Sequence, residues 1–378
     1  MRAAIYGAGS LGTILGAFIT RNGGEIDLIN RNKAHVEALS SKGATVTGTL
    51  NFNQKVNAIT PDMMSGKYDI IFLMTKQQDN ANTVTFLKDY LADDGVIVTL
   101  QNGLPEMLVG SIVGEDRVLG CTVAWGATMK EPGVCELTSE PDSLTFSLGS
   151  ISPSPNLKTS PNPSLKLSPN PSPSQNLKSS QKSSQNPKTN QSPKSNLNPK
   201  FGEVKALLEM MGPVHVDDNF VGNRWSKLLI NSAFSGMSAV LGCTFGETVS
   251  QLRQRRIVQA IMKECMDVCT AGAIRIEPVQ GKDIVKLFNY SNPVKKAISL
   301  ILLPFAIKKH KLLKASMLQD LEKGKKTEVD SINGSVCAYG RKVGCPTPVN
   351  DKVVEIIHKI EDGILTPSFA NLDLFDQK

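Results

Sequence analysis

Lys227 and Asn231 lie four residues apart in the segment NRWSKLLIN, and together they offer an ammonium and an amide. An ammonium supplies hydrogen-bond donors and an amide supplies donors and an acceptor, so the pair is suited to polar chemistry on a small ligand. In a helix this spacing puts both groups on one face, about one turn apart. Trp225, Leu228 and Leu229 would then face other directions and pack into the protein. An isolated Lys/Asn pair is more often a solvated surface pair, so its meaning depends on the rest of the chain.

A glycine-rich turn near the start of the chain is the second chemical feature. It follows a short apolar strand at 2–6, leads into a helix-like run, and consists of Gly7, Ala8, Gly9, Ser10, Leu11 and Gly12. In this context Gly7 permits the tight turn, Gly9 lets the backbone approach a pyrophosphate, and Gly12 lets helix and strand pack closely. The free N–H groups of the helix N-terminus would face the phosphates. A purely structural glycine turn is the alternative; the context favours a nucleotide site.

The residues after the second strand bear on the choice of cofactor. That strand, predicted at 25–30, should end beside the adenosine ribose, where an acidic side chain would favour NAD. Here the strand ends at Asn30 and is followed by Arg31 and Asn32. A guanidinium suits a 2′-phosphate, so the sequence predicts NADP(H). A solvated turn arginine is the alternative.

Two further predicted strands carry polar residues at their carboxyl ends. The strand at 68–76 ends on Lys76, and the strand at 95–103 ends on Asn102 and a glycine. Ligands of open α/β sheets bind beyond the carboxyl ends of the strands, so both side chains should point toward the cofactor.

The order of elements predicts an α/β protein with an N-terminal Rossmann-type dinucleotide-binding domain and an all-helical C-terminal domain. Strand-like stretches within 120–138 and 143–150 are predicted to be antiparallel additions to the first sheet. The first domain is predicted at 1–150 and 201–218, the helical domain at 219–365, and a tail at 366–378. The helical runs expected in the second domain are 224–241, 247–272, 279–288, 293–307, 311–340 and 349–361.

A low-complexity segment at 151–200 interrupts the first domain. It contains ten of the 21 prolines, and it holds seven of the 42 basic residues but none of the 35 acidic ones. With no aromatic residue to bury, it is predicted to be a disordered insert. An inert insert is favoured over a phosphorylation or docking segment built from Ser-Pro pairs. The rest of the chain is balanced in charge, so no nucleic-acid-binding surface is predicted.

The patterns of cysteine, histidine and apolar residues argue against a disulfide-rich, metal-binding, secreted or membrane-spanning protein. Seven cysteines occur without a CxxC pair and four histidines are scattered, so neither a disulfide framework nor a metal site is predicted. The N-terminus lacks a signal-peptide pattern. The longest apolar run, 298–307, contains a proline and is too short to span a bilayer. A cytoplasmic protein is expected.

The stretch at 315–334 places a hydroxyl and a carboxylate near each other along the chain. Ser316 is predicted near the start of a helix, with Glu328 on the same helix just over three turns later. The basic run from Lys323 to Lys326 would be the solvated face of that helix. An exposed helix carboxylate, or one paired with a nearby lysine, is the alternative for Glu328.

Taken together, these motifs resemble the ketopantoate reductase (2-dehydropantoate 2-reductase) family. The resemblance rests on GAGSLG at 7–12, TK at 75–76, LQNG at 100–103, NRWSKLLIN at 223–231 and SMLQDLEKGKKTEVDSING at 316–334. It covers 1–149 and 201–362. It implies a Rossmann domain followed by a helical domain, with NADPH and substrate bound in the cleft between them.

The resemblance also implies roles for the substrate-facing residues. Lys227 corresponds to the proton donor of the family, and Asn231 and Ser316 correspond to residues that hold the substrate. Asn102 would contact both cofactor and substrate. Ser235 stands where many members have a second asparagine, and its shorter side chain would alter the preference for substrate.

The remaining implied roles concern the cofactor. Arg31 matches a position that contacts the adenosine phosphate end of the cofactor, and Lys76 matches a position that contacts the cofactor. Ala127 matches a further cofactor contact. Glu328 would lie at the junction of the nicotinamide ribose and the substrate.

The reaction implied is NADPH-dependent reduction of 2-dehydropantoate to pantoate, a step toward pantothenate and coenzyme A. Hydride transfer to a 2-oxo carbon creates an alkoxide, which an ammonium such as that of Lys227 can stabilise and protonate without a metal. Two alternatives stay open: reduction of another branched 2-oxo acid, and a non-catalytic NADP-binding regulatory protein. The expected partner is a small-molecule 2-oxo acid, with a homodimer left open.

Overall fold

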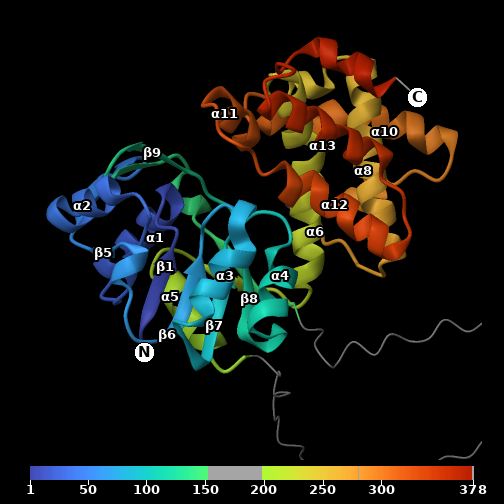
Figure 1. Cartoon of the computed structure of the whole chain (residues 1–378). Helices are drawn as coiled ribbons and strands as arrows, with labels where there is room; N and C mark the ends of the chain where they lie inside the picture. Colours follow the sequence, from blue (N-terminus) through green and yellow to red (C-terminus); the bar gives the residue numbers. More distant parts are fainter. Residues whose placement is uncertain (152–197, 280, 377–378) are drawn as a thin grey trace, which may run out of the picture. The chain divides into compact units, whose positions relative to one another are not determined.

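The computed structural model describes residues 1–151, 198–279 and 281–376 of the 378-residue chain. Nearly all of the segment predicted to be a disordered insert, 151–200, lies outside the described residues. All strands that the structure describes fall within 1–150 and 201–218, and the chain after Asn219 is helical. The predicted α/β architecture, with a parallel sheet followed by a helical region, is confirmed (Figure 1).

The first sheet has eight strands in the order β12-β11-β8-β7-β6-β1-β2-β5. Its strands are β1 (Ala3–Tyr6), β2 (Asp27–Ile29), β5 (Asn57–Ile59), β6 (Tyr68–Leu73), β7 (Leu91–Thr99), β8 (Val118–Val123), β11 (Phe146–Ser150) and β12 (Val214–Val216). Every neighbouring pair is parallel except β8 and β11, which are antiparallel. The strand β1 is buried along its whole length, as expected for a parallel sheet covered on both faces.

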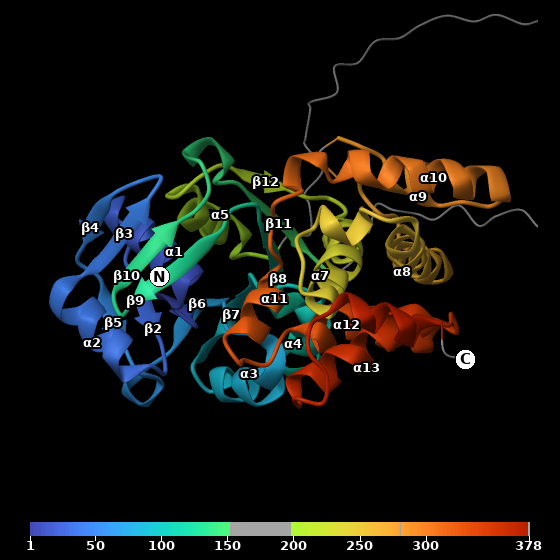
Figure 2. The same cartoon turned by 90° about the horizontal axis from the view of Figure 1, so that it is seen from above.

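Helices cover both faces of this sheet. They are α1 (Ser10–Arg21), α2 (Lys33–Lys42), α3 (Asn80–Lys88), α4 (Pro105–Val113) and α5 (Phe201–Glu209). Alternate residues of the strands enter different cores, because successive side chains point to opposite faces. Ile5 and Phe72 join the core with α1 and α5, whereas Tyr6 and Ile71 join the core with α3 and α4. Figure 2 shows α5 on one side of the sheet and α3 and α4 on the other.

A second sheet corrects the prediction that the strands in 120–138 extend the first one. It has four strands in the order β4 (Phe52–Gln54), β3 (Ala44–Gly48), β10 (Val134–Leu137) and β9 (Ala127–Glu131). Of the strands expected within 120–138 and 143–150, only β8 and β11 join the first sheet, and β8 is parallel to β7. The second sheet packs against α1, where Phe18 meets Phe52 edge-on with ring centroids 5.2 Å apart. A strand pattern shows which residues are buried, but it does not show which neighbouring strand they pair with. Here β9 and β10 pack on the apolar face of α1 and therefore pair in the second sheet instead of the first.

The helical region begins with α6 (Phe220–Ile230), a π-helical turn (Asn231–Ser235) and α7 (Gly236–Leu241). It continues with α8 (Leu252–Ala271), α9 (Ile284–Phe288), α10 (Pro293–Ala306), α11 (Ser316–Glu322), α12 (Val329–Val343) and α13 (Pro348–Glu361). The residues predicted to be a tail include a 3₁₀ helix, Phe369–Phe375, where the Asn371 amide donates to the Val240 carbonyl over 2.9 Å. No helix among the described residues is long and apolar enough to cross a membrane.

The single helix predicted over 311–340 is wrong. α11 ends at Glu322, Gly324 takes a left-handed φ of 62°, and Glu328 caps the start of α12. The basic run from Lys323 to Lys326 therefore forms a connection rather than a helix face. Ser316 and Glu328 come from two helices, so their spacing along the chain does not set their separation.

Candidate active site

The glycine turn after β1 has the geometry that a dinucleotide requires. Gly7 has a φ of 96°, and a Cβ there would lie 2.5 Å from the backbone nitrogen of Thr75. A Cβ at Gly12 would lie 2.9 Å from Ile5 Cγ2, whereas Gly9, which precedes α1, meets no atom closer than 3.9 Å. The turn therefore requires glycine where the backbone packs and leaves the helix N-terminus open to a phosphate.

A cavity of about 490 Å³ opens beside this turn. It lies at the carboxyl ends of β1, β2 and β6, where the sheet runs from β1 to β2 on one side and to β6 on the other, the usual position of a ligand in this architecture. Arg31 and Lys76, which the sequence analysis assigned to the cofactor, line it together with Gly7 and Gly9. Arg31 is exposed and takes part in no ion pair with another described residue.

Lys76 is held by the helical region. Its ammonium lies 2.7 Å from the carboxylate of Asp320 on α11. The neighbouring Gln78 amide donates to the backbone carbonyls of Lys326 and Thr327, over 3.0 and 2.9 Å. The connection between α11 and α12 thus closes over the strand end that carries Lys76, and its Lys325 also lines the cavity.

Arg224 holds α6 against the carboxyl end of the sheet. Its side chain is 2% exposed, and its Nε donates to Glu106 Oε1 over 2.8 Å. Its Nη1 donates to the Gln101 carbonyl over 2.7 Å, and Nη2 donates to the Thr99 carbonyl over 3.1 Å. The contacts fix the helix one turn before Lys227. Neither Arg224 nor Glu106 was predicted from the sequence, although the arginine among the apolar residues of 223–231 was a usable sign for Arg224.

Lys227 lies half-buried at the end of β8. Its ammonium donates to the Val123 carbonyl over 3.4 Å. Burial and, to a smaller extent, the positive charge of Arg224 together lower the pKa of Lys227 to about 8, against the opposing effects of Cys121 and Glu328. An amine with such a pKa exchanges protons readily near neutral pH, which suits a general acid.

A π-helical turn follows directly, where the sequence predicted an unbroken helix. The Gly236 N–H donates to the Asn231 carbonyl, five residues back. π-turns of this kind occur frequently at functional sites. Asn231 is half-buried, and among the described residues its side-chain amide has no hydrogen-bond partner, so it is available to a ligand. Ser235, at the end of the turn, is buried.

Asn102 and Glu328 meet across the two regions. The Asn102 side-chain amide donates to Glu328 Oε2 over 3.2 Å, and the backbone carbonyl of Asn102 accepts from the Gln77 side-chain amide. Burial raises the pKa of Glu328, while the hydrogen bond from Asn102 and the charges of Lys76 and Lys227 lower it. The structure therefore gathers a carboxylate, an amide and two ammonium groups that are far apart in sequence.

Two predicted residues are placed differently. Ser316 is the exposed first residue of α11, on a different helix from Glu328. Ala127 begins β9 in the second sheet and is not among the described residues that line the nucleotide cavity.

The parallel sheet, the glycine turn and the ammonium and amide beyond its strands define a nicotinamide-dependent oxidoreductase with a small-molecule substrate. Comparison with known proteins agrees. The family model "Ketopantoate reductase PanE/ApbA" matches residues 3–150, and "Ketopantoate reductase PanE/ApbA C terminal" matches 219–361. The chain belongs to the ketopantoate reductase family.

Individual relatives are distant in sequence but match over more than nine-tenths of their length. A 2-dehydropantoate 2-reductase of Pyrococcus horikoshii is 25% identical over 352 residues, covering 93% of this chain and 94% of the relative. A 2-dehydropantoate 2-reductase of Streptococcus pyogenes is 23% identical and covers 96% and 98%.

Solved structures share the fold. A PanE/ApbA family ketopantoate reductase from Ralstonia eutropha has a TM-score of 0.71 at 22% identity, covering 96% of this chain and 99% of that one. A D-mandelate dehydrogenase, solved with NADH and anilino(oxo)acetate, has a TM-score of 0.70 at 21% identity, with the same coverage of 96% and 99%.

Proposed function

We propose that the protein reduces 2-dehydropantoate to pantoate with NADPH and that Lys227 is the proton donor. The observation behind this proposal is the half-buried Lys227, whose pKa is lowered to about 8 and which is held beyond the sheet one turn after the Arg224 contacts. The names of the relatives from Pyrococcus and Streptococcus support the same substrate.

Different residues of the chain would have different roles around a bound 2-oxo acid. NADPH, when bound, supplies the hydride that reduces the 2-oxo carbon. The Lys227 ammonium stabilises the negative charge that develops on the oxygen and transfers a proton to it, so that a neutral alcohol and a neutral amine result. The free amide of Asn231 and the hydroxyl of Ser316 are donors for the substrate carboxylate. Asn102, held by Glu328, would orient the nicotinamide end of the cofactor.

The assay that tests this proposal follows the loss of reduced nicotinamide absorbance with 2-dehydropantoate and a panel of other 2-oxo acids. Turnover of 2-dehydropantoate is the expected result. Turnover of a different 2-oxo acid, without turnover of 2-dehydropantoate, would favour the alternative function, reduction of another branched 2-oxo acid. Tight NADPH binding without turnover of any 2-oxo acid would contradict both reductases.

Arg31→Asp should shift the cofactor preference from NADPH toward NADH. Arg31 lines the nucleotide cavity without an acidic partner, and a hydrogen bond to a charged group contributes about 1.5–3 kcal/mol. The ratio of kcat/KM with NADPH to kcat/KM with NADH should therefore fall by about 10- to 150-fold. Lys33→Asp, an equal charge change at an exposed residue outside the cavity lining, is the control. An unchanged ratio in Arg31→Asp would remove the 2′-phosphate role.

The rate of reduction should fall as pH rises through about 8. Below its pKa of about 8 Lys227 is protonated and can donate, whereas above it the neutral amine cannot, so kcat/KM should drop about tenfold per pH unit. Oxidation of pantoate needs the neutral amine as base, so its rate should rise through the same pH. Glu328→Gln removes a charge that raises this pKa and should move both midpoints lower. Flat profiles in both directions would show that another group transfers the proton.

A further inference from the structure

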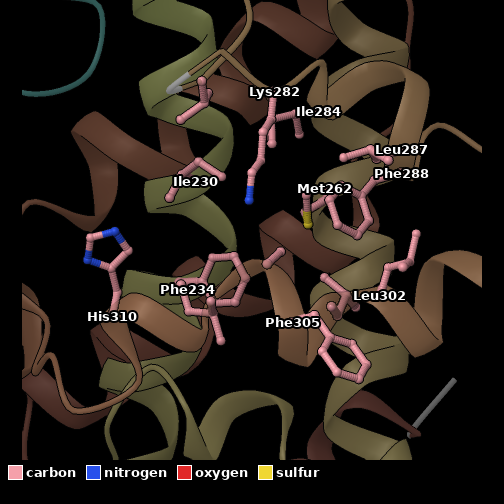
Figure 3. Close-up of a pocket in the computed structure, with 14 residues that line it drawn as sticks. Ile230, Phe234, Met262, Lys282, Ile284, Leu287, Phe288, Leu302, Phe305 and His310 are labelled. Carbon is pink, nitrogen blue, oxygen red and sulfur yellow. The ribbon is translucent and has the colours of Figure 1, made fainter.

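A second cavity, of about 370 Å³, lies within the helical region and takes no part in the mechanism above. Its walls come from α6, the π-turn, α8, α9 and α10, and they are mainly apolar. Figure 3 shows Phe234 and Ile230 on one side of it, facing Met262, Phe288 and Leu302 on the other.

This cavity adjoins the residues proposed to bind substrate. Ile230 directly precedes Asn231, and Phe234 directly precedes Ser235. With Lys227 they fall at intervals of three and four residues, so the wall continues the helix face that carries the ammonium. His310, also in the lining, lies six residues before Ser316, and its carbonyl accepts from the Leu313 N–H in the connection that leads there.

The Lys282 side chain, just before α9, lines this cavity and places a positive charge in it. Figure 3 shows the Lys282 side chain with its ammonium directed into the space between Ile230 and Met262. Among the described residues no carboxylate pairs with Lys282 or with His310. An unpaired ammonium facing apolar walls is complementary to a ligand that is apolar along its length and anionic at its far end.

We infer that this cavity admits the side chains of 2-oxo acids longer than 2-dehydropantoate, and that among these longer acids the protein favours those whose apolar chain ends in a carboxylate that pairs with Lys282. The inference rests on the proposed 2-oxo acid reduction and deepens it. The cavity volume of about 370 Å³ is the volume that roughly twelve water molecules occupy in liquid water, at about 30 Å³ each. The short branched side chain of 2-dehydropantoate would leave most of that space unfilled.

The first test compares 2-oxooctanedioate with 2-oxooctanoate, two acids of equal length that differ in the terminal carboxylate. The wild-type protein should show a kcat/KM about tenfold higher or more for the dicarboxylate, the factor that one charge-assisted hydrogen bond supplies. Lys282→Met should bring the ratio to about one. Lys286→Met removes an exposed lysine of α9 that is outside the lining, and it should keep the wild-type ratio.

The second test fills the cavity. Leu302→Trp should lower the ratio of kcat/KM for 2-oxooctanoate to kcat/KM for 2-dehydropantoate at least tenfold. Ile301→Trp makes the same change one residue earlier on α10, at an exposed position outside the lining, and should keep the ratio. If Leu302→Trp does not fold, Lys282→Met, a change at an exposed residue, decides the matter.

The outcomes separate this inference from the proposed function. Turnover of 2-dehydropantoate, with both ratios indifferent to the lining variants, would overturn the inference and leave the proposed function standing. Failure of the wild-type protein to reduce any 2-oxo acid would overturn both. Ratios that respond to Lys282→Met and Leu302→Trp but not to their controls would establish the site.

Discussion

Lys227→Ala should lower kcat for reduction of the 2-oxo acid by a factor of about 10³, within the range that general acid catalysis contributes. The substitution removes the ammonium that would neutralise the developing alkoxide and protonate it. NADPH affinity should change little, because the nucleotide cavity is lined by other residues, among them Gly9 and Arg31. Single-turnover kinetics and a fluorescence titration with NADPH measure the two effects separately.

Lys227→Arg is the matched control. It keeps the positive charge but not the ability to give up a proton near neutral pH, because a guanidinium stays protonated. Its kcat should therefore stay well below the wild-type value even if substrate affinity recovers. Added methylamine should restore part of the activity of Lys227→Ala. Wild-type turnover in Lys227→Ala would show that the proton donor is misassigned.

Arg224→Met should be the most destabilising single change considered, by about 3–5 kcal/mol in the free energy of unfolding, because it leaves the Glu106 carboxylate buried without its partner. The Arg224 and Glu106 side chains are 2% and 3% exposed, so water cannot replace the lost contact. Urea unfolding measures the loss. The kcat should fall as well, since Arg224 positions the helix that carries Lys227.

A double-mutant cycle makes this prediction specific. Arg224→Met combined with Glu106→Gln should be less destabilised than the sum of the two single variants, because no buried charge is left unpaired. Arg253→Met breaks an exposed pair with Asp373 and Asp376 and should cost less than about 1 kcal/mol. Equal losses in Arg224→Met and Arg253→Met would contradict the role assigned to the buried pair.

The fold class and several site positions were predictable because they depend on local rules. Gly7 must adopt a positive φ and pack against Thr75, so the glycine turn is visible in the sequence. Lys76 and Asn102 end buried parallel strands, whose carboxyl ends meet at one edge of the sheet. The helical period placed Lys227 on the helix whose other faces are buried, as Trp225 and Leu229 confirm.

Other predictions went wrong where a local pattern had two outcomes. The strand-like stretches of β9 and β10 were predicted correctly, but β10 pairs with β3, and β9 with β10, in a second sheet that packs against α1. The run at 311–340 is helical at both ends, yet Gly324 interrupts it and sets Glu328 at the start of a new helix. The π-turn after α6 is a single turn of five residues, too short to change the apolar pattern of the segment visibly, so the sequence does not distinguish it from an α-helical turn.

By itself, therefore, the sequence determined the two regions, the nucleotide turn, and which helix and strand ends bear polar side chains. Only the tertiary structure decided that Arg224 pairs with Glu106, that Asn102 meets Glu328, and that Lys282 enters an apolar cavity. Periodicity reports whether a residue is buried, but the identity of its partner depends on contacts between separate segments, which lie 118 residues apart for Arg224 and Glu106 and 226 apart for Asn102 and Glu328. The lowered pKa of Lys227 has the same origin, because its largest cause, desolvation, exists only once α6 lies on the sheet.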